Sequence, residues 1–301
     1  MVEREVYECL SQDEELAGLL AQYESGPAIF YQLVPADSDE GWDGIQYPRI
    51  LFDIDTETNP ERKNAGVLMI TIACRSNSDV QPEPIVKRIL QLIDGCFFTT
   101  TDGYTAAASW QRTDGFRTDT QRLESQPLQD YIFGSEMTFD LLDFPQQIMA
   151  GMDPLALMNT WTKEKRPSAK VINLDSLDSI WRPTDDMPAI YWRLASVSND
   201  AQMMRYDTNM VTWMRAVMQC HVLAPSTGTR TNIIKGIAEA LYQARQLPFP
   251  DKSPLLIQQI AGNTGASPLR VGQLTLNGTY GVLRKLEGTP IININISQGG
   301  L

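Results

Sequence analysis

Two stretches of the chain show the same order of apolar and polar positions. The first, residues 47–142, predicts strand, strand, helix and hairpin over residues 50–54, 67–74, 84–94, 105–111 and 131–142. Ile50, Phe52 and Ile54 alternate with Leu51 and Asp53, which is typical of a strand with one buried face. A polar excursion over residues 113–127 is predicted between the last two strands.

Residues 187–283 repeat this order at nearly the same spacing. Met187–Ile190 corresponds to Tyr47–Ile50, and Ile233–Lys235 corresponds to Ile85–Lys87. The repetition predicts an α/β (α+β) fold of two similar modules, residues 1–148 and 149–301, each a mixed or antiparallel sheet covered by helices. Sequence identity between the two stretches is low, so a chance recurrence of a common strand–helix order is the alternative.

Each module is predicted to begin with a helix. Ser11 and Glu14 match a capping box, and the apolar residues behind them have helical spacing: Leu16, Leu19, Leu20 and Tyr23. Gly26-Pro27 is predicted to end this helix. Residues 152–161 are the predicted first helix of the second module.

Charge separates the two halves more clearly than the apolar pattern does. The chain has 301 residues and a net charge of -12; residues 1–150 hold 10 Lys+Arg and 26 Asp+Glu, whereas residues 151–301 hold 15 and 11. An acidic protein is a poor general binder of nucleic acid, because phosphates require clustered basic side chains. No apolar run is long enough to cross a membrane, and the acidic start does not resemble a secretory signal. The four scattered cysteines indicate reduced thiols in a cytoplasmic product.

The sequence predicts no catalytic, cofactor-binding or metal-binding residue. Its single histidine, His221, lies in a predicted strand, without Cys or carboxylate partners at ligand spacing. We find no P-loop, G-x-G-x-x-G or G-x-S-x-G motif. The loop 37–44 resembles a calcium loop but has Gly41 at its fifth position and lacks the spaced glutamate. A small-ligand α/β enzyme therefore remains only a distant alternative.

Three groups of residues are candidates for contacts with other molecules instead. The first is an acidic loop that would face a channel or the end of a tube: Asp37, Asp39, Glu40, Trp42 and Asp43. The second is a basic run that would dock an acidic partner: Lys163, Lys165 and Arg166. The third is a C-terminal strand with one apolar face, which either edges its own sheet or pairs with a neighbouring copy: Ile292, Ile294 and Ile296.

The first module resembles the tail terminator (tail completion, head-tail joining) proteins of tailed bacteriophages. The resemblance covers about residues 1–144 and lies in the segments SQDEELAGLL (11–20), IFYQLVP (29–35) and YPRILF (47–52), followed by the strand to Cys74 and the helix to Asp94. It implies a small α/β fold with a mixed sheet covered by two helices, and no catalytic residues. The family would end near Phe144, so the second module is either a diverged copy or an attached domain.

The resemblance also implies partners. A tail terminator is a structural virion protein of the tail-neck region, assembled in the host cytoplasm, which caps the tail tube as a ring of six and receives the head-completion (neck) protein. DNA would pass through without specific binding. Two modules per chain allow a hexamer, which the unequal charges favour, or a trimer with pseudo-sixfold symmetry. The alternative function is another neck or tube-sheath connector of a contractile tail, in which the second module contacts sheath protein.

Overall fold

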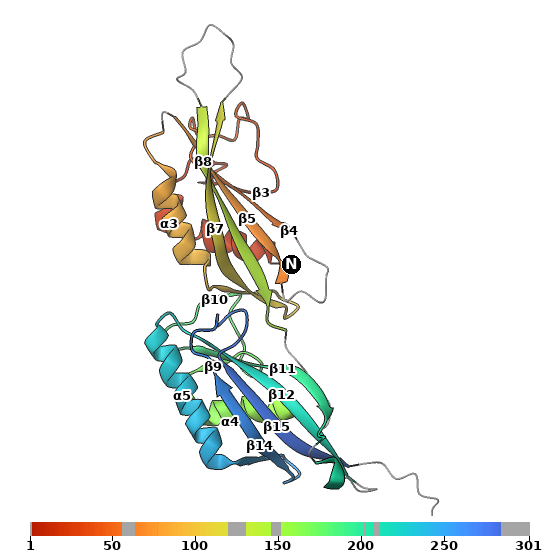
Figure 1. Ribbon diagram of the computed structural model, residues 1–301. Coiled ribbons are helices and arrows are strands. Elements are labelled where there is room, and N and C mark those ends of the chain that lie inside the picture. The colour runs from red at the N-terminus through yellow and green to blue at the C-terminus, as the bar shows by residue number, and fades with distance from the viewer. Residues whose placement is uncertain are drawn as a thin grey trace, which may run out of the picture.

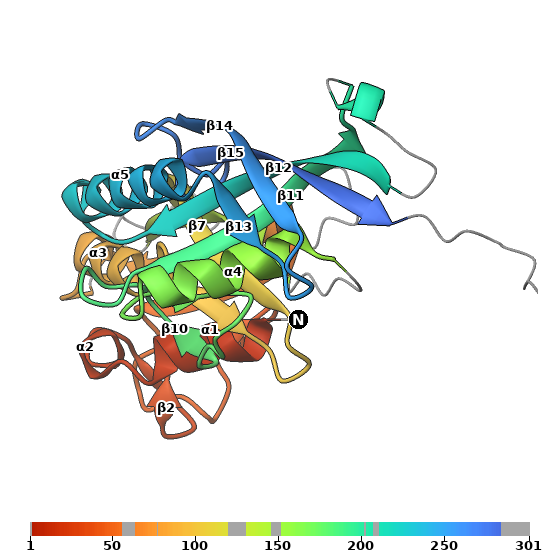
Figure 2. The ribbon, with the colours of Figure 1, turned by 90° about the horizontal axis from the view of Figure 1, so that it is seen from below.

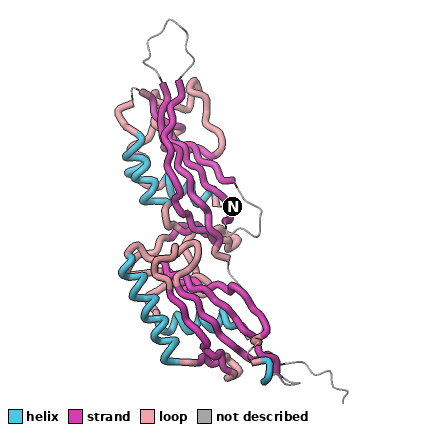
Figure 3. The backbone as a smooth tube through the Cα atoms, in the orientation of Figure 1, coloured by secondary structure: helices cyan, strands magenta, loops and turns pink. Residues whose placement is uncertain are grey.

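The chain folds into two curled mixed sheets with helices packed against each of them (Figures 1 and 3). The structure is a computed structural model that describes residues 2–55, 64–76, 78–119, 131–145, 152–201, 203–206 and 211–283. This α+β architecture, with one sheet following the other along the long axis of the molecule, confirms the predicted fold class.

Sheet 1 has seven strands in the order β10-β6-β7-β8-β5-β4-β3. Its strands are β3 (Ile29–Tyr31), β4 (Arg49–Asp55), β5 (Asn64–Arg75), β6 (Phe97–Thr99), β7 (Thr105–Asp119), β8 (Tyr131–Asp143) and β10 (Ile180–Trp181). Neighbouring strands are antiparallel except for β3 and β4, which are parallel. A small separate ribbon is formed by β1 (Gln22–Tyr23) and β2 (Gly26–Pro27).

Sheet 2 has six strands in the order β13-β14-β15-β12-β11-β9. Its strands are β9 (Lys170–Val171), β11 (Ala189–Asn199), β12 (Val211–Leu223), β13 (Gln246–Pro248), β14 (Pro254–Gly262) and β15 (Leu274–Leu283). Here too a single neighbouring pair, β9 and β11, is parallel. Strand for strand, this order matches sheet 1 from β6 to β3, so the two sheets have the same topology.

The helices occupy matching places in the two halves. They are α1 (Glu3–Ser11), α2 (Glu14–Ala17) and α3 (Pro82–Ile93) in the first half, and α4 (Pro154–Lys165) and α5 (Thr227–Ala244) in the second; a 3-10 turn, η1, covers Met204–Tyr206. Helix α3 connects β5 to β6, as α5 connects β12 to β13, while α1 and α4 precede the parallel edge strands β3 and β9. Among the described residues, no helix is both long and apolar enough to cross a membrane.

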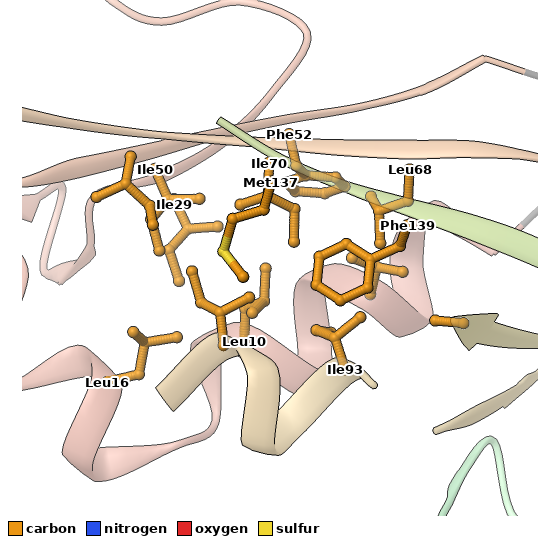
Figure 4. Packing of buried hydrophobic residues seen from close by; sticks show 14 of the residues in the cluster. Leu10, Leu16, Ile29, Ile50, Phe52, Leu68, Ile70, Ile93, Met137 and Phe139 are labelled. Carbon is orange, nitrogen blue, oxygen red and sulfur yellow. The ribbon is translucent and has the colours of Figure 1, made fainter. Parts of the chain in front are cut away.

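In the part of the chain that the structure describes, helices cover one face of sheet 1 and leave the other without a helix. The apolar side chains of α1 and α3, such as Leu10 and Ile93, pack onto Ile70, Met137 and Phe139 (Figure 4). Strand β4 shows the same alternation, with Ile50, Phe52 and Ile54 buried and their neighbours partly exposed. Each such side chain stabilises the fold by about 1.5–3 kcal/mol when it leaves water. In sheet 2, α4 and α5 cover Trp192, Met218 and Leu276 in the same way.

The structure differs from the sequence prediction at the first helix. The predicted capping box at Ser11 and Glu14 is wrong, because Ser11 ends α1 and the cap of α2 is Asp13, whose carboxylate accepts a bond of 2.8 Å from Leu16 N. Two bonds from Arg88 hold Asp13 in place. Helix α2 lasts four residues, and Tyr23, which the prediction placed on the helix, lies in β1.

The hairpin β7–β8 also extends beyond the predicted boundary. The polar excursion predicted for residues 113–127 is wrong for 113–119, which continue β7 and pair with residues 131–137 of β8. Polar residues form a strand here because one partner strand satisfies the backbone while the side chains stay in solvent. The remaining residues, 120–127, lie outside the described part of the chain.

Candidate interaction surfaces

The acidic loop is ordered by contacts within its own half of the chain. Asp37 Oδ1 accepts a bond of 2.6 Å from Arg49 Nη1, and Tyr47 Oη donates to Asp37 Oδ2 over 3.2 Å. Asp39 Oδ1 accepts from Tyr23 Oη at 3.0 Å and from the backbone N–H of Gly41 at 2.9 Å. Two of the four predicted carboxylates thus stabilise the loop itself.

Trp42 is a buried anchor of this loop. It is only 9% exposed, and its indole N–H donates to Ala36 O over 2.9 Å. Its ring meets Tyr23 edge-on at 5.0 Å and Phe30 at 5.7 Å, measured between centroids. The side chain that the sequence offered for a partner therefore packs internally, whereas all four carboxylates of the loop, those of Asp37, Asp39, Glu40 and Asp43, are exposed.

The basic run does not form one surface. Lys163 Nζ lies 2.7 Å from Asp175 Oδ2 and donates to Ala169 O, so it ties α4 to the segment around β9. The guanidinium of Arg166 lies over Gly236 of α5, where a Cβ would overlap it. Of the three predicted docking residues, Lys165 is the fully exposed one. The third predicted group, Ile292, Ile294 and Ile296, lies outside the described residues.

An aromatic junction between the two sheets was missed by the sequence prediction. Phe144, at the end of the first half, packs edge-on against Tyr191 at 5.0 Å and against Phe97 at 5.1 Å. His221 belongs to this cluster: its ring centroid is 6.0 Å from that of Phe144, and its Nδ1 is 2.7 Å from Pro268 O. The lone histidine is therefore 1% exposed and packed into the junction.

Polar and backbone contacts also cross the junction. Strand β10, which lies in the sequence after α4, pairs with β6 and so completes sheet 1. Arg270, from the connection between β14 and β15, forms an ion pair with Asp140 on β8. A cavity of about 490 Å³ opens beside these contacts; Arg182 and Arg230 line it, but both donate to backbone carbonyls. The spacing of apolar residues gave no sign of these contacts, because they join segments far apart in sequence.

Burial perturbs several titratable groups near the junction. It raises the pKa of the Asp143 carboxyl, an effect that nearby Arg193 partly opposes, and it raises the pKa of Tyr191. Burial also raises the pKa of Cys220 and, at the far end of sheet 1 where Cys74 pairs with Phe133, brings that of Cys74 to about 11, so neither thiol is an activated nucleophile. Within the described residues, no group of three His, Cys, Asp or Glu side chains is arranged to hold a metal ion.

The sheet faces that helices leave uncovered differ in charge. Strands β4, β5 and β8 of sheet 1 place four carboxylates and two arginines on this side: Asp53, Asp55, Glu136, Asp140, Arg49 and Arg75. The matching strands of sheet 2, β11, β12 and β15, contain Arg193 and Arg215 and no carboxylate. Asp53 pairs in register with Met69, which pairs with Thr138, so these side chains share the partly exposed face.

Comparison with protein-family models gives no match, and comparison with curated proteins gives none either.

Proposed function

We propose that this chain is a structural virion protein that caps a phage tail tube as a ring, ends tail polymerisation and offers the surface for head-tail joining. The observation that carries the proposal is the uncovered face of sheet 1, a curled surface whose central strands carry more carboxylates than arginines. A surface that repels phosphate suits the wall of a channel through which DNA must move, because counterion-releasing contacts would hold the DNA back.

The balance of positive and negative side chains on the uncovered face of sheet 1 supports the proposal that it lines a channel. Asp140 is neutralised by Arg270, and the guanidinium of Arg49 lies over the Tyr47 ring beside Asp37. The carboxylates that then give this face its net negative charge are those of Asp53 and Asp55 at the end of β4 and of Glu136 on β8. In a ring of six, each of these carboxylates occurs six times around the channel. We therefore propose this face as the channel wall, with the exposed loop positions Glu40 and Asp43 as further acidic groups.

The arrangement of the halves favours six chains over a trimer with pseudo-sixfold symmetry. A pseudo-sixfold trimer requires the two modules, near residues 1–148 and 149–301, to play equivalent roles in one ring. Here equivalent strands carry opposite net charge, and one sheet follows the other along the molecule (Figure 1). Two stacked tiers, one per module, fit these features better. In that arrangement each tier has its own outer surface. One of these surfaces contacts the tail tube, the head-completion protein or a sheath protein.

Electron microscopy of particles assembled without this protein tests the proposal most directly. We expect tails of uncontrolled length, or complete tails that do not join heads. Normal, filled and infectious particles would overturn the proposal. Light scattering on the purified chain gives a second readout, in which six chains per particle are expected.

A charge-reversal variant tests the channel wall separately. Changing Asp53, Asp55 and Glu136 to lysine is expected to leave particles assembled but to slow DNA ejection. The control carries lysine at three exposed carboxylates of the second half, Glu164, Asp186 and Asp251. Equal ejection from both variants would contradict the assignment of the acidic face to the channel.

A further inference from the structure

The four cysteines of the chain do not share one environment. Cys74, Cys96 and Cys220 are buried, whereas Cys9 on α1 is half-buried and therefore open to small molecules in the solvent. Cys74 and Cys220 lie on different sheets, in β5 and β12. Cys9 and Cys96, which are far apart in the sequence, both lie at the C-terminal end of α3.

Hydrogen bonds at the end of α3 bring Cys9 and Cys96 together. The Cys9 thiol donates to Leu92 O over 3.7 Å, and the backbone N–H of Cys96 donates to Ile93 O over 3.0 Å. Leu92 and Ile93 are the last two residues of α3, so the two cysteines bind successive carbonyls of one helical turn. Helix α1 also contacts β6, the strand that begins directly after Cys96.

Strand β10 brings a positive charge to these two thiols. It lies beside α1 (Figure 2), and an apolar residue of β10 packs against the core cluster that α1 helps to form. The Cys96 thiol donates to Trp181 O over 3.6 Å, and the guanidinium of the next residue, Arg182, donates to Asp94 O. Cys9, Cys96 and Arg182 therefore come from three separate segments of the chain and meet at one place.

The two thiols differ in how readily they lose a proton. A hydrogen bond with Cys96 lowers the pKa of Cys9; burial and the Asp13 carboxylate oppose this shift, and the charge of Arg182 supports it. The same hydrogen bond, together with burial, raises the pKa of Cys96. Cys9 is therefore the thiol that supplies the reactive thiolate, and Cys96 is placed as the second, resolving thiol.

We propose that Cys9 and Cys96 form a reversible disulfide when the protein meets hydrogen peroxide, and that this bond locks α1 to the turn between α3 and β6. The Cys9 sulfur attacks one peroxide oxygen and the O–O bond breaks, which leaves a sulfenic acid on Cys9 and releases one water that carries the Cys9 proton. The Cys96 sulfur then attacks the Cys9 sulfur. The S–S bond forms, the S–O bond breaks, and the hydroxide leaves as water with the Cys96 proton. Two thiols and one peroxide thus give one disulfide and two waters.

The bond would act close to the place where the two halves join. It closes a loop that contains α1, α2, α3, β3, β4 and β5, and a cross-link over so long a loop restricts the unfolded chain strongly. The inference does not depend on the proposed ring. Under the proposed function, the thiols stay reduced while particles assemble in the host cytoplasm and pair in oxidising surroundings after release.

Peroxide treatment of the purified full chain tests the pairing. The reduced chain is treated with hydrogen peroxide, the remaining thiols are blocked with N-ethylmaleimide in denaturant, and a digest is analysed by mass spectrometry without reduction. We expect a peptide pair linked through Cys9 and Cys96 that separates on reduction, with the maleimide on Cys74 and Cys220. Another linked pair, a link between two chains, or a Cys9 that stays a thiol or is oxidised without a link would overturn the proposal.

Cysteine variants separate the two steps of the reaction. In Cys96→Ser the first step proceeds and the second cannot, so we expect dimedone to trap a sulfenic acid at Cys9. Cys9→Ser should give neither the link nor a dimedone adduct. Cys74→Ser is the matched control and should form the link as the parent does. A dimedone yield in the Cys96 variant that is no higher at Cys9 than at Cys74 would contradict the assignment of Cys9 as the reactive thiol.

Thermal unfolding tests whether the bond is a lock. We expect the oxidised chain to unfold at a temperature at least about 4 °C higher than the reduced chain, because the cross-link limits the freedom of the unfolded state. The same peroxide treatment should leave the unfolding temperature of Cys9→Ser unchanged. A chain that carries the link but unfolds at the same temperature as the reduced chain would overturn the lock.

Discussion

Strands β4, β5 and β8 of sheet 1 match strands β11, β12 and β15 of sheet 2 in order and direction, yet their charges are opposite. On the uncovered face the first set places four carboxylates and two arginines; the second places two arginines alone. Both sets keep apolar residues on the helix-covered face, such as Ile70 in β5 and Met218 in β12. The alternation that specifies a strand leaves every second position free, so topology and surface charge vary independently.

The proposed roles of the two halves rest on this difference in charge. In the first half the acidic face supports the proposed channel wall, whereas in the second half β11, β12 and β15 carry no carboxylate and expose apolar residues such as Val197 and Leu283.

The largest expected difference concerns one glycine in each of the matching strands β8 and β15. At Gly134 a Cβ would overlap the carbonyl oxygen of Ile72, which is backbone and cannot move aside. At Gly278 a Cβ would meet the end of the Leu255 side chain at 2.8 Å, which can rotate. We expect Gly134→Ala to cost at least about 3 kcal/mol of unfolding free energy and Gly278→Ala about 1 kcal/mol.

Urea unfolding followed by circular dichroism measures both losses on the same chain. Equal losses of unfolding free energy would show that the close approach of β8 to β5 does not make a Cβ at Gly134 more costly than one at Gly278. In that case the two sheets would be equivalent in packing as well as in topology.

The second prediction concerns the junction. Phe144→Ala removes the ring that joins Phe97 to Tyr191 and is expected to cost about 3–5 kcal/mol. Because that contact joins the sheets, we also expect scanning calorimetry to show one thermal transition for the parent and two for the variant. Leu33→Ala, at a side chain 81% exposed, is the control and should change neither quantity. One unshifted transition in the Phe144 variant would show that the halves are coupled elsewhere.

The ion pair between Asp140 and Arg270 is expected to contribute less. The Arg270 side chain is 39% exposed, so solvent screens the pair and its coupling should be about 1 kcal/mol or less. A double-mutant cycle with Asp140→Asn and Arg270→Gln measures this coupling, which should shrink as salt is added. A coupling that is unchanged in high salt would indicate a desolvated pair that holds the sheets together strongly.

Alternating apolar positions were sufficient to predict the strands at 50–54 and 67–74, helical spacing predicted α3, and the repeated order of elements predicted the equivalence of the halves. These features depend on local periodicity, which a single sequence displays. The first helix was misplaced because Asp13 is fixed as the cap by Arg88, a residue 75 positions away. Strand β10 has two residues and is defined by its partner β6, so no local pattern predicts it.

The candidate sites were harder to predict than the fold. The acidic loop and the basic run were predicted to bind partners because of their charge. In the structure, Asp37 and Lys163 form ion pairs within the chain, with Arg49 and Asp175. Trp42 illustrates the same limit, since an aromatic residue in a polar loop gives no sign of the pocket that receives it. The exposed apolar residues at the outer end of sheet 2, such as Val197 and Leu283, were missed because they look like ordinary strand residues until the ends of α4 and α5 are known.

The smallest expected effects come from two carboxylates with opposite pKa shifts. The hydrogen bonds from Arg88 lower the pKa of Asp13, so its contribution to stability is present above the ordinary carboxyl pKa of about 3.9 and is lost as pH falls through the lowered value. Burial raises the pKa of Asp143, so its ionisation destabilises the fold as pH rises through the raised value. Asp13→Asn should therefore destabilise the chain at neutral pH, by about 1 kcal/mol or less, whereas Asp143→Asn should stabilise it slightly. Asparagine keeps the helix cap at Asp13, so the change isolates the charge. Both differences from the parent should shrink in acid, and unfolding free energies measured from pH 3 to pH 7 would contradict this account if the two variants shifted in the same direction.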